Sequence, residues 1–453
     1  MALGIACAPP EEEASIVAQV GDHRITAEDF RLNYAFGHGT LRTGTNPREV
    51  YLGWMIREQL LAQEAERRGL DTAAVVRFNR RTMAEELLVE HAFQRYVLDE
   101  VSVTDEEVEA AINRRAVQFQ FRFIPALNER DGERIRTAWV DQGFESVLDA
   151  RREALAEVNL FAENLISPLV RAADIEPDLL TILQELPVNT PSVPVQRDGQ
   201  WFVFEVTDVR RDRLAPADYA QQGASVRKVL YNQKAMQQGT QFVADTMMPL
   251  DVITKREGFD VLRTALWAWY RAEPPIRPLS HYLSNRAFTA DYAVLLRQHT
   301  ETPLITFDDT VWTIADFAEQ FTPGRYQLDL DDERAFTARL ADVVALVVRD
   351  AVLIANAQQD RLDQTAAYQH ELAQWTDHWR FRALRRQLGA RDLVAFTDSL
   401  WAVTDVHIYR TVLDTLTIPV DDTRAQQQTV FLLKSHSNRP AFPVVDRDWG
   451  KVP

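Results

Sequence analysis

Apolar and polar residues alternate along two short segments of the chain, and each segment runs directly into a helical pattern. The first, residues 16–26, alternates over five residues, turns at Gly21-Asp22 and then resumes its alternation. Strict alternation predicts a strand, and Gly at a turn tolerates the backbone angles that a tight reversal needs. Thr26 stands three residues before Asp29, which is the spacing of a capping box. We therefore expect a β-hairpin followed at once by a capped helix.

A second segment, residues 304–317, repeats this order of strand, two-residue turn and capped helix. Thr313 and Asp316 stand at the positions of the first capping pair, and Phe317 stands at the position of Phe30. A Thr-capped helix after a tight turn is common, so a chance match is one explanation of the similarity. The long amphipathic helices that follow in both places favour a duplicated module instead.

Long amphipathic helices are expected after each hairpin. Residues 50–69 carry an apolar stripe that ends at Gly69, a further helix is expected over about 72–98, and Thr104 opens another capping-box pattern. The main helix after the second hairpin is expected from 336 to about 362, and the acidic run 329–333 is interpreted as its N-terminus. Its apolar stripe consists of Leu340, Val343, Val344, Val347 and Val348. These patterns predict a mostly α protein.

Residues 117–210 have a different character. Residues 117–124 alternate strictly and place Phe119, Phe121 and Phe123 on one side of a strand. Helical stretches follow, and the segment closes with a turn at 197–199 and a second strand over 201–207. A strand, several helices and a closing hairpin predict a small α+β domain.

These features resemble the SurA/PrsA/PpiD type of extracytoplasmic folding factors, which are chaperones with parvulin-type peptidyl-prolyl isomerase domains. The opening at residues 16–30 is similar to their N-terminal module, and residues 186–206 are similar to the end of a parvulin domain. The resemblance implies a multi-domain, mostly α fold with one α+β parvulin-like domain and SurA-N-like helical modules, each opened by a short hairpin. The expected parts are a signal remnant or lipoprotein tether (1–14), a SurA-N-like module (15–115), a degenerate parvulin-like domain (116–212), a helical segment (213–300), a second SurA-N-like module (301–416) and an extended C-terminal tail (417–453).

The residues that active parvulins share are missing from this segment. Those domains resemble one another in a His on the first strand, a later acid or thiol, a Gly-Gly loop and a second His on the last hairpin. Here Phe123 stands where the first His is expected, residues 200–204 contain no His, and residues 117–210 contain neither His nor Cys. We therefore name no catalytic residue and expect a domain without isomerase activity. An active isomerase with an atypical pocket remains the alternative, so enzyme activity is left open.

No cofactor and no metal site are expected from the remaining candidates. His370 and His378 lie eight residues apart, which is too far for two ligands one helical turn apart, and Trp375 and Trp379 beside them indicate packing. Ser435-His436-Ser437 has no acid nearby in the sequence, so a nucleophile–base pair is not expected there.

An aromatic group at 267–270 allows two interpretations. Trp267 and Tyr270 stand three residues apart, as residues on one core-facing side of a helix do, and Trp269 lies between them. Exposed rings that contact a client polypeptide are the alternative. We favour the core.

Charge and cysteine usage narrow the setting. A net charge of −17 argues against nucleic acid as a partner, and no apolar run is long enough to suggest a membrane span. The single cysteine, Cys7, follows small Ala6 and precedes a Pro-containing acidic stretch, which resembles the end of a bacterial lipoprotein signal. Cys7 is thus the candidate lipid attachment site. The alternative is a cysteine without a role in a terminal segment.

The resemblance implies an envelope chaperone in the periplasm, lipid-anchored to a membrane. Its partners would be unfolded or extended polypeptides, outer-membrane proteins among them, and no nucleotide is implied. Two alternatives stay open: an active prolyl isomerase, and a structural or assembly lipoprotein that binds one fixed partner.

Overall fold

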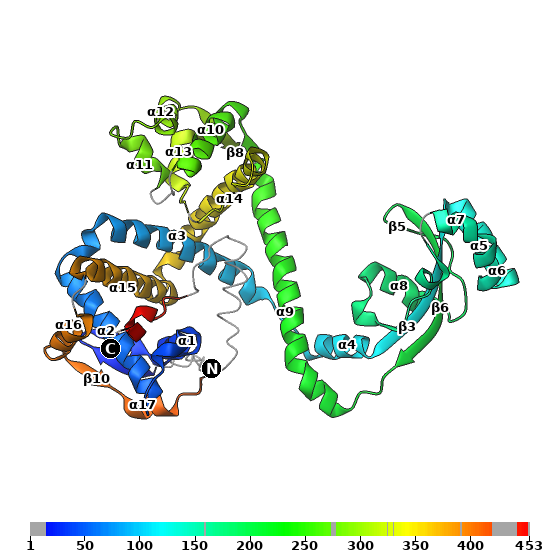
Figure 1. Cartoon of the computed structure of the whole chain (residues 1–453), viewed down its shortest axis with the longest axis horizontal. Helices are drawn as coiled ribbons and strands as arrows, with labels where there is room; N and C mark the ends of the chain where they lie inside the picture. The colour runs from blue at the N-terminus through cyan, green and yellow to red at the C-terminus, as the bar shows by residue number, and fades with distance from the viewer. Residues whose placement is uncertain are drawn as a thin grey trace, which may run out of the picture. The chain divides into compact units, whose positions relative to one another are not determined.

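The computed structural model describes residues 15–157, 160–272, 278–323, 325–328, 330–389, 392–418 and 442–451 of the chain. The chain folds into two compact units, which are described separately (Figure 1). Unit 1 takes its residues from 1–98 and 241–453, and unit 2 is formed by residues 99–240. Unit 1 is therefore assembled from both ends of the chain, with unit 2 inserted between them.

The first hairpin of unit 1 forms as expected and gains a third strand from the C-terminal part of the chain. Strands β1 (Ile16–Val20) and β2 (His23–Thr26) are antiparallel, and β10 (Val406–Ile408) pairs with the other edge of β1. Gly21 takes a φ of 57° at the turn. Around this sheet pack α1 (Ala27–Phe36), α2 (Pro47–Arg67), α15 (Ala366–Leu388), α16 (Leu393–Trp401) and α17 (Arg410–Thr415).

The second hairpin of unit 1 consists of β8 (Pro303–Phe307) and β9 (Thr310–Thr313), and β7 (Ile253–Thr254) pairs with β8. Asp308, at the position of Gly21 in the first hairpin, also takes a left-handed φ, of 48°. The helices around it are α10 (Arg256–Ala272), α11 (Leu279–Ser284), α12 (Asp291–Gln298), α13 (Ile314–Gln320) and α14 (Glu333–Gln359). They bury a large apolar core that includes Trp269, Phe317 and Phe336.

Helix α3 (Ala74–Tyr96) packs against both α14 and α15, and α15 also packs along α2 (Figure 1). Leu87, Ala357, Tyr368 and Trp375 form the centre of this helix packing. Because α15 belongs to this group and to the first hairpin's core, it holds the N-terminal and C-terminal parts of unit 1 together.

Unit 2 is built on a four-stranded antiparallel sheet in the order β4-β3-β6-β5. Its strands are β3 (Val117–Ala126), β4 (Val170–Arg171), β5 (Val195–Arg197) and β6 (Gln200–Arg211). One face is covered by α5 (Glu129–Gln142), α6 (Phe144–Ala150) and α7 (Arg152–Glu157), and the other by α8 (Pro177–Glu185) (Figure 1). Helix α4 (Asp105–Arg115) packs on α9 (Pro216–Met247) through Ile112 and Val226. Asp198 and Gly199 both have positive φ, as a tight type I′ hairpin requires.

The mostly α, multi-domain fold with small antiparallel sheets is confirmed. All three predicted capping boxes form: Thr26, Thr104 and Thr313 each accept a hydrogen bond from the third helical residue, whose carboxylate bonds back to the cap's N–H. These caps depend on contacts within four residues, which is why spacing alone could predict them.

The aromatic group does pack against the core, although the residue at its centre is not one of the two expected to face it. Trp269 is completely buried, whereas Trp267 and Tyr270 are partly buried and pack against the same core. Trp267 contacts Phe336, with ring centroids 5.1 Å apart. The predicted stripe on α14 is buried along its whole length. Asp332 caps this helix by accepting a hydrogen bond from the N–H of Ala335, in agreement with the interpretation of the acidic run.

Residues 442–451 contribute two side chains to the core of unit 1. Within the expected tail, residues 443–446 have no regular structure and η8 (Arg447–Lys451) is a 3₁₀ helix. Val445 and Trp449 are buried with the first hairpin's core. Residues 442–451 are called the C-terminal segment below. Cys7 and Ser435-His436-Ser437 lie outside the described residues, and the domain boundaries expected from the sequence stay predictions.

Candidate functional site

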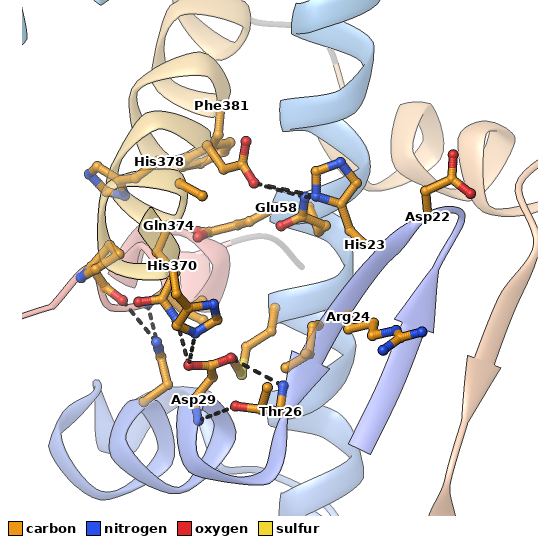
Figure 2. Close-up of a pocket in the computed structure, with 18 residues that line it drawn as sticks. Asp22, His23, Arg24, Thr26, Asp29, Glu58, His370, Gln374, His378 and Phe381 are labelled. Carbon is orange, nitrogen blue, oxygen red and sulfur yellow. Dashed lines mark hydrogen bonds and ion pairs between the residues drawn. The ribbon is translucent and has the colours of Figure 1, made fainter. Parts of the chain in front are cut away.

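A cavity of about 460 Å³ opens in unit 1 beside the first hairpin (Figure 2). It is lined by the β2 strand and the start of α1, the middle of α2, one face of α15 and the C-terminal segment. The helical repeat of α15 places polar side chains from successive turns along the cavity, because residues three and four apart share a face. These side chains are His370, Gln374, Asp377 and His378.

Asp29 serves the helix cap and the cavity at the same time. One carboxylate oxygen, Oδ2, accepts the Thr26 N–H at 3.1 Å. The other, Oδ1, lies 2.9 Å from His370 Nε2 and accepts from Gln374 Nε2 at 2.5 Å (Figure 2). Burial opposes ionisation of Asp29, but the bond and charge of His370 outweigh it, so the pKa of Asp29 is lowered. The same bond raises the pKa of His370, which favours its protonated form.

A second polar bridge joins the hairpin to α15 through α2. The side-chain amide of Gln59 lies 2.9 Å from His23 Nδ1 and donates to Asp377 Oδ2 at 3.0 Å. Asp377 is also held by Arg380, whose Nη1 lies 3.1 Å from Oδ1. Both carboxylate oxygens of Asp377 therefore have partners from the protein itself.

Glu58 reaches the cavity from α2 and binds the C-terminal segment. Its Oε1 accepts two hydrogen bonds, from the N–H of Asp446 at 2.8 Å and from Nε1–H of Trp449 at 2.9 Å. Burial raises the pKa of Glu58 to about 7, although these two bonds favour the ionised form. Glu58 was not among the site residues predicted from the sequence. The available signal was a carboxylate placed between Ile56 and Leu60 of a buried stripe.

His378 and His370 differ from each other, which corrects the interpretation of both as packing residues. His378 does pack, in contact with the rings of Trp375, Trp379 and Phe381, and burial lowers its pKa to about 4. His370 instead forms the ion pair with Asp29. The sequence could not show this pairing because its partners lie 341 positions apart. Within the described residues, no group of three or more His, Cys, Asp or Glu side chains is arranged to hold a metal ion.

In unit 2, the position where a catalytic His is expected is occupied by a ring cluster. Phe123 pairs across the strands with Phe204, and its ring lies 5.9 Å from that of Phe204 and 6.0 Å from that of Phe202. These three side chains, called the ring cluster below, lie on the α8 face of the sheet. Phe123 and Phe202 are partly exposed. Phenyl rings offer contact area but no proton donor or acceptor.

The opposite face of the same sheet holds a charged pair that is fully engaged. Arg122 Nε lies 2.5 Å from Glu205 Oε2, and the guanidinium stacks over the Phe144 ring at 4.3 Å. Glu205 is only 3% exposed. A buried carboxylate that is already paired in this way is not a free acid for catalysis, and loss of its partner would leave an uncompensated buried charge.

No protein-family model matches the chain, and no curated protein matches it. Solved structures that it matches include the peptidylprolyl isomerase PrsA of Bacillus anthracis, at 16% identity over 42% of this chain and 92% of that one, with a TM-score of 0.22. PrsA of Bacillus cereus matches at 15% identity over 51% and 90%, with a TM-score of 0.25.

A third match comes from work on two SurA-like chaperones of Campylobacter jejuni, PEB4 and Cj1289. It shows 13% identity over 51% of this chain and 96% of that one, with a TM-score of 0.21. Because all three TM-scores lie below 0.5, no residue role is transferred from these structures to this chain.

Proposed function

We propose that this chain is a chaperone-like folding factor of the SurA/PrsA type, which acts outside the cytoplasm and holds unfolded polypeptides. The resemblance of its hairpin-and-helix modules and its α+β segment to those factors supports the class. The proposal includes outer-membrane or secreted proteins as clients, which would be held by weak apolar and main-chain contacts.

The single observation that carries the proposal is the partly exposed ring cluster of unit 2. It adds to a wider excess of exposed apolar side chains in this unit. Of the sixteen large apolar side chains found exposed among the described residues, nine lie in unit 2, which has under a third of the chain. Leu127, at 87% exposed, follows the end of β3, and Val193, at 60%, precedes β5, the strand that pairs with β6. Exposed apolar area of this kind favours the binding of unfolded segments.

The same cluster supports a parvulin-like unit without isomerase activity. Rotation about a peptide bond has a barrier of about 18–20 kcal/mol, and active parvulins lower it with polar groups around an apolar proline pocket. The face around Phe123 offers the rings of Phe202 and Phe204 in place of such groups. We expect no acceleration of prolyl cis–trans exchange by micromolar protein, measured on a proline peptide by NMR exchange spectroscopy. A clear rate increase over buffer would establish the active isomerase instead.

Attachment to a membrane is proposed through lipidation of Cys7. No helix within the described residues is long and apolar enough to cross a bilayer. Mass spectrometry of the protein expressed with its native upstream sequence tests the attachment. A mass increase that Cys7→Ser removes would support the anchor, and an unmodified Cys7 would refute it.

The chaperone activity is tested by light scattering of a dilute unfolded outer-membrane protein with and without near-equimolar chain. We expect suppressed aggregation, and we expect Phe202→Ser to weaken it because a partly exposed ring is lost. Val209→Ser is the matched control: it lies on the same strand, is 42% exposed, and stands outside the ring cluster. Unchanged aggregation with the wild-type chain would refute the holding function. A single partner that co-purifies in stoichiometric amount would then favour an assembly lipoprotein.

A further inference from the structure

The cavity of unit 1 is separate from the ring cluster, which belongs to unit 2, so client binding at the rings does not explain the polar lining of the cavity. Four carboxylates line this cavity: Asp22, Asp29, Glu58 and Asp377. The one guanidinium that lines it belongs to Arg24, which is exposed and extends away from α15 (Figure 2). An excess of acidic groups in a recess favours a positively charged ligand.

Of the three carboxylates Asp29, Asp377 and Glu58, only Glu58 has an oxygen that is not already bonded to another described part of the protein. Asp29 and Asp377 each use both oxygens on partners from the protein, as described above. Glu58 concentrates its two bonds on Oε1. Among the described residues, no hydrogen bond to its Oε2 is found, and this atom is not among the buried unpartnered ones. Oε2 of Glu58 is therefore accessible and free to accept from a ligand.

The cavity also has apolar lining residues from four parts of unit 1. Ile25 of the hairpin, Met55 of α2 and Phe381 of α15 line the cavity, and the C-terminal segment contributes Pro443 and Val445. A ligand with a short alkyl stem can cover these side chains while its charged end reaches a carboxylate. Lys and Arg side chains have this form, with an apolar stem and a cationic head.

We propose that this cavity binds the side chain of a Lys or Arg residue from a client polypeptide, with the cationic head at Glu58 Oε2 and the stem on Met55 and Phe381. This inference rests on the proposed function, since it names the part of a client that unit 1 recognises. The cavity thereby adds charge selection to the apolar contacts of unit 2.

An anionic ligand fits this cavity less well. His370 is the one histidine there whose positive charge is favoured, and Asp29 already neutralises it at 2.9 Å. His378 is held neutral by burial. Arg385, near Glu58, is held by Asp446 and Asp448 at 2.7 Å each. No unengaged cation therefore faces the interior of the cavity from the described elements.

Binding is expected to depend on pH, because the head group needs an ionised Glu58. The pKa of Glu58 of about 7 implies a protonated carboxyl below that pH and a carboxylate above it. The other charged or titratable groups around Glu58 are His23 on β2, Asp29 on α1, Tyr51 on α2, His370, Asp377, His378 and Arg385 on α15, and Asp446 and Asp448 on the C-terminal segment. With Glu58 as the controlling group, affinity rises about tenfold from pH 6 to pH 8, following the ionised fraction.

The test uses the full chain and an unstructured Gly/Ser peptide with one central Lys, titrated by calorimetry at pH 6 and pH 8. We expect binding of this peptide and of its Arg analogue, and at least tenfold weaker binding when norleucine replaces Lys. Glu58→Gln should weaken Lys-peptide binding at least tenfold and remove its pH dependence, because the amide oxygen keeps both bonds from the C-terminal segment. Glu49→Gln, on the same helix but outside the cavity, should bind like the wild type.

Equal binding of the norleucine peptide would overturn the proposal, as would binding that Glu58→Gln leaves unchanged. Binding of free butylamine as tight as that of the Lys peptide would identify a small amine as the ligand and overturn the client assignment. The wild-type pH dependence requires no variant, so it tests the proposal even where Glu58→Gln fails to fold. The scattering assay run in parallel separates the two proposals: suppressed aggregation without Lys-dependent binding rejects only the cavity assignment.

Discussion

Removal of the Trp449 side chain should loosen unit 1 and leave unit 2 unaffected. Trp449 is 3% exposed and stacks on Trp54, with ring centroids 5.4 Å apart, and on Phe381 at 6.3 Å. Its Nε1–H donates to Glu58. Trp449 is the larger of the two buried side chains that the C-terminal segment adds to the first hairpin's core.

The expected loss can be worked out from these contacts. Truncation of a buried Trp to Ala removes its apolar contacts and leaves a cavity, at a cost of about 3–5 kcal/mol. Trp449→Phe keeps most of the stacking but removes the donor to Glu58, which costs about 1–2 kcal/mol. If packing contributes most of the stability at Trp449, the loss in Trp449→Ala should therefore be about three times the loss in Trp449→Phe.

Hydrogen-exchange mass spectrometry measures both losses in the full chain. Peptides from α2 and α15 should exchange faster in Trp449→Ala, with the opening free energy lowered by about 3–5 kcal/mol, and less so in Trp449→Phe. Peptides from unit 2 are the internal control and should not change. A loss below about 1 kcal/mol in α2 and α15, or an equal change in unit 2, would refute the reasoning.

Three further predictions concern unit 1. The pKa of Glu58 is about 7 in the folded state against an ordinary value of 4.5, so the folded state binds this proton more tightly than the unfolded state does. The stability that the bound proton contributes at acidic pH is therefore lost as the pH rises through 7. Thermal unfolding from pH 5 to pH 8 should show the wild type losing about 2–3 kcal/mol relative to Glu58→Gln, and parallel stability curves for the two proteins would contradict this pKa shift. Asp350 is 2% exposed and bonds Arg325 at 2.8 Å, so Asp350→Ala should cost about 3–5 kcal/mol in urea unfolding by leaving a buried cation unpaired, and a cost under about 1 kcal/mol would contradict the pairing. A Cβ at Gly258 would lie 2.3 Å from the Pro303 carbonyl oxygen, so Gly258→Ala should force the backbones of α10 and β8 apart. We expect this shift to cost about 1–3 kcal/mol of stability and to lower the midpoint of urea unfolding. An unchanged midpoint would mean that α10 and β8 can move apart without cost.

The parts of the fold that could be predicted from the sequence are those set by near neighbours. The Thr26–Asp29 cap needs only a spacing of three residues, and the α14 stripe needs only helical periodicity. The Asp198-Gly199 turn needs two residues that tolerate positive φ. Each of these structures has its physical cause within a few positions of the chain, so pattern and spacing are sufficient.

The candidate cavity could not be predicted in this way. Asp29 and His370, or Glu58 and Trp449, meet only after α1, α2, α15 and the C-terminal segment have packed together. Nothing local distinguishes Glu58 from the other acids of α2 until its bonds to Asp446 and Trp449 are known. The same holds for the ring cluster, where the sequence indicates that a His is absent but does not show which side chains fill the space.

The inserted position of unit 2 has a consequence for the order in which the protein matures. Residues 99–240 form unit 2 from one continuous stretch, so this unit can fold while the remainder is still being synthesised. Helices α1 and α2 precede unit 2 in the chain, yet the core that they share includes Phe381, Leu413 and Trp449, which follow it. Unit 2 can therefore fold before the core of unit 1 is complete. Loss of residues 442–451 would remove Trp449 from the core of unit 1 and leave the core of unit 2 intact, so unit 1 can be opened without unfolding unit 2.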